Sequence, residues 1–597
     1  MPLDIAKPGD LRPGDYQSLA RSIRASVGQQ GGLNIALLSS NSFEFLDPYL
    51  VVECARRDLP ASLWSAPFGQ IEQAILDEGS ELWSFMPAVV VVGVRIEDVY
   101  PDAFVRGSHD GGATLQQKIE ECVDRLDSCV ATIRARSDAR VLVSNFALPQ
   151  RDVSLRVFDA NNAHGCAISL ATANRELTSR IAGRSGAEIW DYSGLVSARG
   201  AATWTDQRLW QLARQPIAAA NMPFAAEHLA KTISAMLQPR AKCLVLDLDN
   251  TLWGGAAGDD GIQGIVLGDD YPGSAFKSFQ RAVLGLRDQG VLLAISSKND
   301  ERTAREIIEN HPEMLLRWED FVCARINWDS KSANLMRIAE EVGVGVDSLV
   351  FFDDNPVERA EVQMNAPDVN VIDVPVDPIN FQDALFDCGL FDTPTLSAED
   401  AQRAQQYSDE ARRLSSRKPA GSLQDFLRDL EMKASIDDVD DQTLSRASQL
   451  IGKTNQFNLT TRRHNQATLS EMIAADNYDV RFTRLHDKFG DSGIIGITIV
   501  QYNGNAATID SFLMSCRVMN RQVECAMLCD IAERSRGRDC SVLRGIYVPT
   551  AKNEMIADLY SKQGFSLDRQ DADGSHFSID LSVESQSLQW PEVLSRN

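Results

Sequence analysis

Two pairs of aspartates in the middle of the chain could carry out phosphate chemistry. Asp247 and Asp249 end one apolar run, and Asp353 and Asp354 end another. Residues two apart in an extended segment point to the same side, and carboxylates that close repel one another unless a hard cation lies between them. Mg²⁺ takes a few carboxylates together with phosphate oxygens, and a carboxylate can itself attack phosphorus. The two pairs therefore predict a Mg²⁺-dependent phosphoryl-transfer site.

A hydroxyl and an ammonium group occur between the two aspartate pairs. The triplet Ser297-Lys298-Asn299 follows a third apolar run, and Lys331 lies early in a predicted helix. Turn and helix-cap chemistry explains an aspartate after a strand for either pair alone. It does not explain four such features in this order, which together supply metal ligands, an acid and phosphate-binding groups.

The segments that must position these residues alternate between strands and helices. Strands are predicted at 242–247, 291–295, 348–352 and 369–374. Such alternation indicates a mostly parallel sheet with both faces covered. In an open sheet of this kind, ligands bind outside the carboxyl ends of the strands, which is where the aspartate pairs lie.

Flanking segments predict two further domains. Before the aspartates, strands are predicted at 33–38, 88–94 and 139–144, with an amphipathic helix at 115–135. After them, helices at 443–452, 522–535 and 553–563 mix with strands at 480–485, 493–501, 507–512 and 541–548. We predict a multidomain α/β protein: a parallel α/β domain over 1–235, a Rossmann-like domain over 236–390, a helical connector over 391–435 and an α+β domain over 436–597.

Composition and charge exclude several classes of protein. The chain has 597 residues, a net charge of −25 and 11 cysteines. Broad nucleic-acid binding needs clustered Lys and Arg, which so acidic a chain does not offer. Its most apolar stretch, 87–94, is far shorter than the roughly 20 residues that span a bilayer, and its start has no apolar signal segment. We expect a cytoplasmic protein with reduced, mostly buried thiols and no nucleic-acid or membrane partner.

The four motifs, taken in order, resemble those of the haloacid-dehalogenase superfamily of phosphatases. Their surroundings are similar to a narrower group, because DLDNTLWGG (247–255), INWDSKSANL (326–335) and FFDDNPVERAEV (351–362) look like the FkbH-like family of polyketide and nonribosomal peptide pathways. In that family a phosphatase-like domain handles 1,3-bisphosphoglycerate and loads a glyceryl unit onto an acyl carrier protein. The resemblance implies this substrate and this partner for the present chain.

The resemblance also implies roles for individual residues. Asp247 would be the nucleophile and Asp249 the general acid and base, while Ser297 and Lys331 would hold the phosphate. Mg²⁺ would be bound by Asp247, Asp249 (through its backbone carbonyl), Asp353 and Asp354. The substrate side would be lined by Thr251, Trp253, Gly254 and Asn299.

One position departs from the family. Many members have Cys directly before the SKN triplet, as a plausible acyl-holding thiol, where this chain has Ser296. Ser is a much poorer nucleophile than Cys at neutral pH unless a base activates it. Either the acyl group passes directly to the carrier thiol, or the substrate is something other than glycerate.

The first domain resembles, more weakly, the SGNH hydrolase-like region at the start of these proteins. Ser39, Ser40 or Ser42 could be a nucleophile and Asn145 an oxyanion donor, but a triad also needs a placed His and an acid. His228 lies in an apparent helix, and no Asp-x-x-His is present. We expect a docking or structural domain rather than an active hydrolase.

The last domain resembles the GNAT acetyltransferase fold through FGDSGIIGI (489–497) and SFLMSCRVMNRQVE (511–524). In that fold a glycine-containing loop and a helix N-terminus bind the pyrophosphate of coenzyme A. Here the corresponding loop has no glycine, so the backbone cannot approach a phosphate as closely. Arg517 and Arg521 either bind the phosphopantetheine phosphate of a carrier protein or are fold residues, and acetyl transfer is not expected.

Three functions follow, in order of preference. The first is glyceryl transfer from 1,3-bisphosphoglycerate to a carrier thiol with phosphate removal. The second is a Mg²⁺-dependent phosphatase for another phosphorylated metabolite. The third is a non-catalytic scaffold that docks a carrier protein. Docking of an acidic carrier would need a local basic patch, for which the candidates are Arg412, Arg413, Arg417, Lys418, Arg462 and Arg463.

Overall fold

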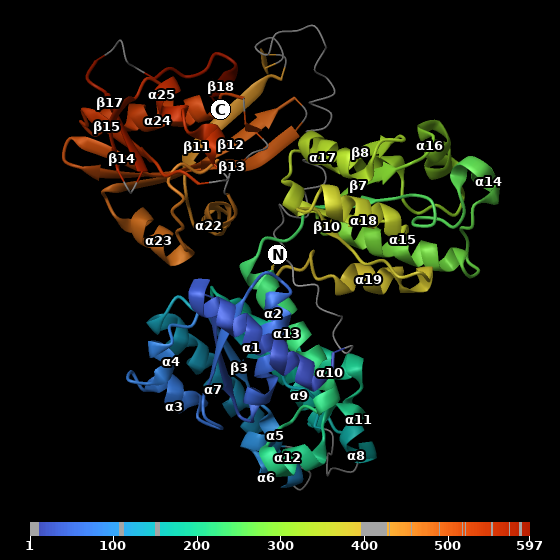
Figure 1. The fold of residues 1–597 in the computed structure, drawn as a ribbon. Coiled ribbons are helices and arrows are strands. Elements are labelled where there is room, and N and C mark those ends of the chain that lie inside the picture. Colours follow the sequence, from blue (N-terminus) through green and yellow to red (C-terminus); the bar gives the residue numbers. More distant parts are fainter. Residues whose placement is uncertain are drawn as a thin grey trace. The chain divides into compact units, whose positions relative to one another are not determined.

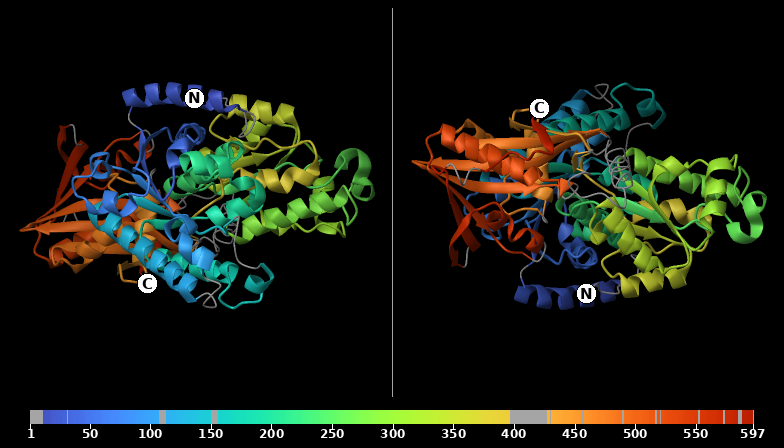
Figure 2. Two further views of the ribbon diagram at one scale, coloured as in Figure 1. Left: turned by 90° about the horizontal axis from the view of Figure 1, so that it is seen from below. Right: turned by 90° about the horizontal axis from the view of Figure 1, so that it is seen from above.

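The computed structural model describes residues 11–30, 32–106, 113–149, 156–395, 427–428, 430–454, 457–488, 490–515, 518–519, 521–550, 553–571, 574–583 and 588–596. It divides into two compact units, Met1–Gln238 with Asp392–Pro394 and Pro239–Phe391 with Thr395–Asn597. The described residues form three β-sheets, which can be followed by colour along the chain in Figure 1 and from two further sides in Figure 2. The predicted multidomain α/β architecture is confirmed.

The first sheet is parallel and has the order β2-β1-β3-β4-β5. Its strands are β1 Leu33–Ser39, β2 Ala61–Ser65, β3 Val89–Gly93, β4 Arg140–Ser144 and β5 Ala187–Trp190. Alternate residues of the central strands pack on opposite faces. One face is covered by α1 Pro13–Gln30, α2 Asp47–Ala55 and α13 Met222–Leu237. The other is covered by α3 Ile71–Leu76, α7 Ala113–Arg136 and α9 Cys166–Ala182.

Shorter helices of the first unit lie between these elements. They are α4 Glu81–Ser84, α5 Ile96–Val99, α6 Pro101–Arg106, α8 Arg156–Ala160, α10 Tyr192–Arg199, α11 Ala201–Trp204 and α12 Gln207–Ala213. Several follow the carboxyl ends of strands, where the loops of a parallel sheet gather.

The second sheet is also parallel, with the order β10-β9-β6-β7-β8. Its strands are β6 Cys243–Leu246, β7 Leu292–Ser297, β8 Phe321–Ile326, β9 Leu349–Phe352 and β10 Asn370–Val371. One face packs on α15 Gly273–Asp288, α16 Glu301–Asn310 and α19 Phe381–Asp387. The opposite face packs on α17 Lys331–Val342 and α18 Pro356–Asn365. The segment α14 Ala257–Gly264 follows the β6 loop and is interrupted at Gly261.

The third sheet is mixed and has the order β16-β17-β15-β14-β13-β12-β11-β18. Its strands are β11 Met432–Asp438, β12 Tyr478–Asp487, β13 Gly490–Asn503, β14 Ala506–Met514, β15 Val542–Tyr547, β16 Ser566–Asp571, β17 Gly574–Asp580 and β18 Leu594–Arg596. Its helices are α22 Leu444–Lys453, α23 Gln466–Ala474, α24 Val523–Gly537 and α25 Leu559–Lys562. Pairing is parallel in β11–β18 and β14–β15 and antiparallel elsewhere.

Three predicted elements differ from the structure. The helix expected at 553–563 is broken into a short 3₁₀ turn and α25, because Asn553 uses its side chain to cross-link buried backbone groups. The strand expected at 369–374 is reduced to β10 because it pairs on one side alone. Within the expected connector 391–435, residues 396–426 lie outside the described part of the chain, and Met432 already begins β11.

Two other observations concern the chain as a whole. The ten cysteines in the described segments are free thiols, eight of them buried, which agrees with the expected reduced and mostly buried state. None of the described helices has the length and apolar character needed to cross a membrane.

Candidate active site

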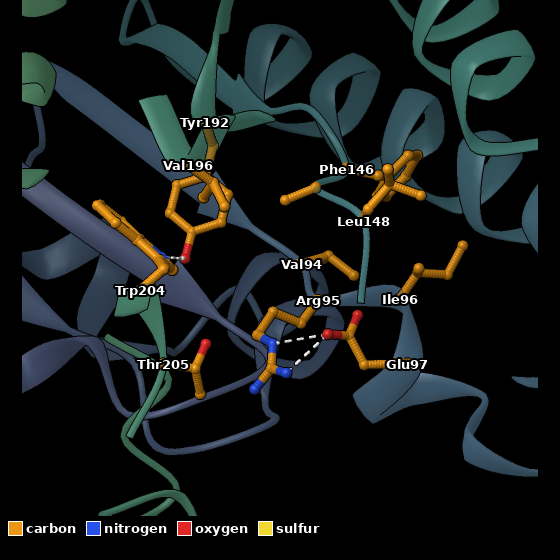
Figure 3. Close-up of a pocket in the computed structure, with 11 residues that line it drawn as sticks. Val94, Arg95, Ile96, Glu97, Phe146, Leu148, Tyr192, Val196, Trp204 and Thr205 are labelled. Carbon is orange, nitrogen blue, oxygen red and sulfur yellow. Dashed lines mark hydrogen bonds and ion pairs between the residues drawn. The ribbon is translucent and has the colours of Figure 1, made fainter. Parts of the chain in front are cut away.

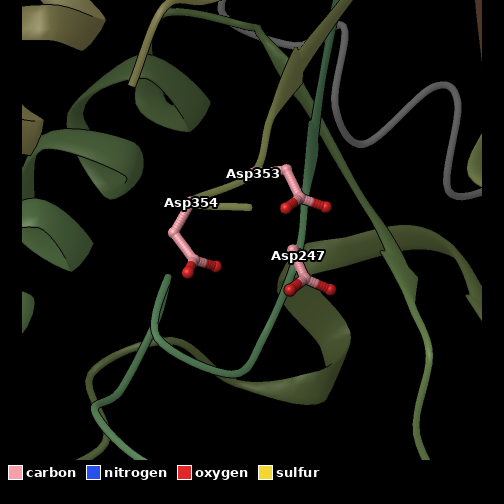
Figure 4. A group of neighbouring side chains, drawn as sticks. All are labelled: Asp247, Asp353 and Asp354. Atoms are coloured by element: carbon pink, nitrogen blue, oxygen red, sulfur yellow. The ribbon is translucent and has the colours of Figure 1, made fainter. Parts of the chain in front are cut away.

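Three carboxylates meet at the carboxyl ends of β6 and β9. Leu246 pairs with Phe352 across these neighbouring strands, so the residues that follow them begin adjacent loops. One ligand oxygen each from Asp247, Asp353 and Asp354 lies within 4.8 Å of the others. Figure 4 shows the three side chains pointing into the same space. Carboxylate oxygens gathered in this way suit a hard divalent cation.

Lys331 joins this carboxylate cluster from the first turn of α17. Its ammonium nitrogen lies 2.6 Å from Asp247 Oδ1 and 2.9 Å from Asp353 Oδ2. It also donates a hydrogen bond of 2.6 Å to the backbone carbonyl of Ser296 at the end of β7. Strands β7 and β9 flank β6, so this lysine connects the loops on both sides of the nucleophile candidate.

Burial shifts the pKa values of the charged groups in this cluster. Burial, and then the negative charge of Asp247, raise the pKa of Asp353 to about 6, although Lys331 opposes the shift. The same two causes raise the pKa of Asp354 to about 6. Burial alone would lower the pKa of Lys331, but the charges of Asp247 and Asp353 more than offset this and hold it above its usual value. The pKa values of Asp353 and Asp354 stay raised although Lys331 opposes the shift, so one lysine does not balance the negative charge of the carboxylates.

The residues present fit a divalent metal ion. With all groups ionised, three carboxylates and one ammonium leave a net charge of about −2. A divalent cation would cancel that charge and would relieve the repulsion that raises the pKa values of Asp353 and Asp354. The cluster thus has the ligand chemistry and the charge that such an ion requires.

The loop after β6 wraps around the side chain of Asp249. Asp249 Oδ1 accepts hydrogen bonds from the Trp253 indole (2.9 Å) and the Ala257 amide (3.0 Å), and Oδ2 accepts one from Asn299 (3.0 Å). The turn is possible because Asn250 adopts a positive φ of 55°, which Asn tolerates better than most residues. The Asp249 carboxylate is therefore fixed by three donors and is not part of the three-carboxylate group.

Three predicted substrate residues, Thr251, Trp253 and Gly254, are buried within this loop. Trp253 is 0% exposed, and its N–H faces Asp249 rather than the outside. A Cβ added at Gly254 would come within 3.0 Å of Phe276 and 3.2 Å of Val266, so the glycine allows the loop to pack closely. Thr251 is also 0% exposed, and its hydroxyl lies 3.3 Å from Asp354 Oδ1.

The loop after β9 is fixed by hydrogen bonds from α18. Arg359 on α18 donates hydrogen bonds to the backbone carbonyls of Asp353 (2.9 Å) and Asp354 (2.8 Å). The Asn355 amide donates to Asp353 Oδ1 at 2.9 Å, and the Asn355 side chain caps α18. These contacts fix the direction in which both carboxylates point.

The two serines at the end of β7 differ in their surroundings. Ser297 is 2% exposed and ends the strand beside β6, consistent with a phosphate-facing position. Ser296 is 0% exposed, and its hydroxyl oxygen is buried without a hydrogen-bond partner in the described structure. Ser296 therefore has no base beside it that would activate the hydroxyl.

The structure does not assemble the hydrolase residues considered in the first domain. Ser39 donates to Asn41, and the Ser40 hydroxyl accepts from the Arg95 amide. His228 Nδ1 accepts a hydrogen bond of 2.9 Å from Trp190, and burial lowers the pKa of this histidine. No hydrogen bond within the described segments joins His228 to a serine after β1.

Asn145 and the neighbouring pocket lead to the same conclusion. Asn145 donates to Asp191 at 2.7 Å and accepts from the Ser193 amide, so it caps a helix. Figure 3 shows the pocket at the ends of β3 and β4, where Arg95 faces Glu97 and Tyr192 faces Trp204. The cavity has a volume of about 30 Å³, enough for about one water molecule. The described residues give no support to a hydrolase in this domain.

In the third domain, the described basic residues considered for carrier binding each contact another group of the chain, although Arg462 and Arg463 are exposed. Arg521 is 6% exposed and lies 3.6 Å from the buried Asp487. Arg462 forms an ion pair with Asp510, and Arg463 donates to backbone carbonyls of Ile451 and Thr454. Arg517 and the candidates at 412, 413, 417 and 418 lie outside the described residues.

Sequence reasoning did not identify the side chains around Lys331 and Lys298. Glu361 on α18 accepts hydrogen bonds from the amide and the hydroxyl of Ser332. Glu358 forms an ion pair of 2.7 Å with Lys298. Because each pair joins residues far apart in the sequence, no local spacing could have revealed it.

One solved structure matches about two thirds of the chain. No family model and no curated protein matches the sequence. The N-terminal part of the protein BF1531 from Bacteroides fragilis, which contains a phosphatase domain and was solved in complex with Mg, is 28% identical with a TM-score of 0.57. The match covers 64% of this chain and 99% of that one.

Two acetyltransferase structures also match, over a smaller part of the chain. The ribosomal-protein-S18-alanine N-acetyltransferase from Escherichia coli is 14% identical, covering 26% of this chain and 99% of that chain with a TM-score of 0.20. The PaiA N-acetyltransferase from Thermoplasma acidophilum, solved with coenzyme A, is 13% identical, covering 25% and 99% with a TM-score of 0.20. These scores are too low to bear on the fold, so the third domain is defined by its own strand order. Over most of its length, the chain is similar to a solved structure that contains a phosphatase domain.

Proposed function

We propose that this chain is a Mg²⁺-dependent phosphoryl-transfer enzyme with Asp247 as its nucleophile. The observation that carries the proposal is the meeting of three carboxylates and Lys331 at one edge of the middle sheet. The similarity to a phosphatase-domain structure that was solved with Mg supports it. A cation bound by Asp247, Asp353 and Asp354 would offset the negative charge of a phosphate group placed beside them.

The residues of the chain divide the reaction into two steps. Asp247 attacks phosphorus, the bond between phosphorus and the leaving oxygen breaks, and Asp249 gives that oxygen a proton. Asp249 then takes a proton from a water molecule, which attacks the aspartyl phosphate and releases inorganic phosphate. Asp249 must turn away from at least one of its three N–H donors to reach the leaving oxygen. Lys331 and Ser297 face the phosphate and keep it in line for attack.

For the substrate and the partner we propose 1,3-bisphosphoglycerate and an acyl carrier protein in the cytoplasm, in a polyketide or nonribosomal peptide pathway. This part of the proposal depends on the sequence resemblance. The phosphate ester reacts with Asp247 as above. The carrier thiolate attacks the acyl carbon, the bond to the second phosphate breaks, and a glyceryl thioester forms. The unactivated Ser296 favours direct transfer to the carrier thiol over an acyl group held at that position.

Mass spectrometry of the carrier tests this proposal. The chain, Mg²⁺ and 1,3-bisphosphoglycerate are incubated with the carrier protein, and the carrier is expected to gain the mass of one glyceryl unit. Asp247→Asn should prevent removal of the ester phosphate. A carrier that gains no glyceryl mass, with its phosphopantetheine arm intact, would contradict the glyceryl-transfer proposal.

A phosphatase acting on another metabolite is the second candidate. Ser296 favours it, because this residue replaces the family's cysteine and has no activating base. Phosphate release without any carrier, abolished in Asp247→Asn, would support the phosphatase. Carrier binding that persists in Asp247→Asn without turnover in the wild type would instead support a scaffold.

A further inference from the structure

A second cation follows strand β7, directly after Ser297, and is held by a glutamate. Lys298 follows β7, and its ammonium nitrogen forms an ion pair of 2.7 Å with Glu358 in the first turn of α18. The Lys298 side chain is 38% exposed and that of Glu358 16%, whereas Lys331 is 2% exposed. Lys298 is thus a cation that solvent and solutes can reach.

The strand order places this ion pair beside the proposed nucleophile. Strand β6, which ends at Asp247, lies between β7 and β9. Lys298 comes from the loop after β7 and Glu358 from the helix after β9, so the pair spans the end of β6. The neighbours of Lys298 also reach the site, since the Ser296 carbonyl accepts from Lys331 and Asn299 donates to Asp249.

The Lys298–Glu358 pair is also incompletely satisfied. Glu358 Oε1 faces Lys298, while Oε2 is buried without a hydrogen-bond partner in the described structure. The lysine end of the pair is the more exposed one, so a substrate anion can compete with Glu358 for it.

The charges of the carboxylate cluster indicate a role for Lys298. Lys331 and a bound divalent cation would together balance the charge of the three carboxylates, so the cluster would have no net positive charge for a second anionic group of the substrate. The nearby Arg359 is engaged with the backbone carbonyls of Asp353 and Asp354. Lys298 is the exposed ammonium that follows directly on the phosphate-facing Ser297.

We propose that Lys298 selects phosphate esters that carry a second anionic group, which displaces Glu358 from the lysine. This inference rests on the proposed phosphoryl-transfer function and narrows its substrate class. The reacting phosphate lies at Asp247, and a carboxylate or second phosphate of the same substrate lies at Lys298. Glu358 occupies the lysine until such a substrate arrives.

Two matched probes isolate the second anionic group. 3-Phosphoglycerate and glycerol 3-phosphate differ in having a carboxylate or a hydroxymethyl group opposite the phosphate ester. The ratio of kcat/KM for the two esters measures the selection and is expected to favour 3-phosphoglycerate in the wild type. In Lys298→Met this ratio should fall by about tenfold or more, as expected for loss of a charge-assisted hydrogen bond. Glu358→Gln should raise it, through a lower KM for 3-phosphoglycerate.

Lys118→Met is the matched control. Lys118 lies in the first domain, is 36% exposed and forms an ion pair of 2.6 Å with Glu121. The likeness is in lysine exposure and in the single glutamate ion pair, and removal of Lys118 should leave the ratio unaltered. An equal loss for both esters in Lys298→Met, or the same ratio in Lys298→Met and Lys118→Met, would overturn the inference.

Binding measurements separate this inference from the proposed function. Calorimetric titration of each ester into Asp247→Asn, with and without Lys298→Met, reports selection without turnover. If the wild type releases no phosphate but Lys298 still discriminates the esters in binding, the proposed function fails and the inference stands. If phosphate is released but binding does not depend on Lys298, or neither ester binds, the inference fails.

Discussion

The ammonium nitrogen of Lys331 lies 2.6 Å from Asp247 Oδ1, although 84 residues separate them in the sequence. The lysine is 2% exposed and also contacts Asp353 at 2.9 Å. A buried cation is tolerated where carboxylates face it, and the carboxylates in turn depend on it. This relationship links the charge of the site to the stability of the middle domain.

Lys331→Met should lower the thermal midpoint of the chain in the absence of Mg²⁺. Breaking a buried ion pair leaves uncompensated charge and costs about 3–5 kcal/mol. Mg²⁺ should recover part of this loss, because it supplies the missing positive charge. Thermal unfolding with and without Mg²⁺ measures both effects. The control is Lys277→Met, which removes a 9% exposed lysine paired with Asp269 and Glu313; equal recovery by Mg²⁺ in both variants would argue against a metal site at Asp247.

Mg²⁺ affinity should fall as the pH drops below about 6. Burial and the charge of Asp247 raise the pKa values of Asp353 and Asp354 to about 6, so their protonation competes with metal binding near that pH. Without metal, the pH dependence of folding stability has the opposite direction to that of Mg²⁺ affinity. A carboxyl pKa that is raised on folding favours the folded state at low pH, and this contribution is lost as the pH rises through about 6. Calorimetric Mg²⁺ titrations at pH 5 to 8 check the first effect, and an affinity that does not vary across this range would contradict it.

Trp253→Phe should lower kcat about tenfold with a smaller effect on KM. The substitution keeps most of the buried ring but removes the N–H that holds Asp249 at 2.9 Å, and a lost hydrogen bond to a charged group is worth about 1.5–3 kcal/mol. Steady-state kinetics with 3-phosphoglycerate measure the change. Trp204→Phe is the matched control for Trp253→Phe, because Trp204 is also a buried indole and donates a hydrogen bond to Tyr192 in the first domain. If the two variants have the same kcat, Trp253 does not act through Asp249.

Asn553→Ala should destabilise the third domain by about 2 kcal/mol or more. Asn553 is 0% exposed, and its amide donates to the carbonyls of Asn458 and Val548, each at 2.9 Å. Its oxygen accepts from the Thr550 amide at 2.7 Å. Urea unfolding measures the loss. Asn505→Ala removes an exposed amide bonded to Ser541 and should cost much less; similar costs would show that the buried cross-link does not matter.

Central strands could be predicted from the sequence and edge strands largely could not. The runs at β1, β3, β6 and β9 are continuously apolar because helices cover both faces. β2, β5 and β8 were not predicted, and each forms an edge of its sheet; the inner strand β11, whose sequence MKASIDD has no apolar run, was not predicted either. Edge strands are less buried, as in β8, where Cys323 and Ile326 alone are buried, and their apolar runs are short and interrupted by polar residues.

The candidate site shows a similar division. The aspartate pairs and Lys331 could be found because each follows a strand or begins a helix, and parallel strands bring such positions to one edge. The direction of Trp253 toward Asp249 could not be found, since it depends on the positive φ of Asn250. The Lys298–Glu358 pair depends on the register of β7 and β9 across β6, which 60 intervening residues do not encode locally.

Direct titration of Mg²⁺ is the most direct test of the proposed site. Calorimetry at pH 8 on the full chain should show binding of one Mg²⁺ ion, because Asp247, Asp353 and Asp354 supply three ligand oxygens within 4.8 Å of one another. Asp353→Asn should weaken this binding by about tenfold or more, as one charged ligand is lost. If Asp353→Asn binds Mg²⁺ as the wild type does, or the wild type binds none, the cation does not lie among these carboxylates and the proposed chemistry is wrong.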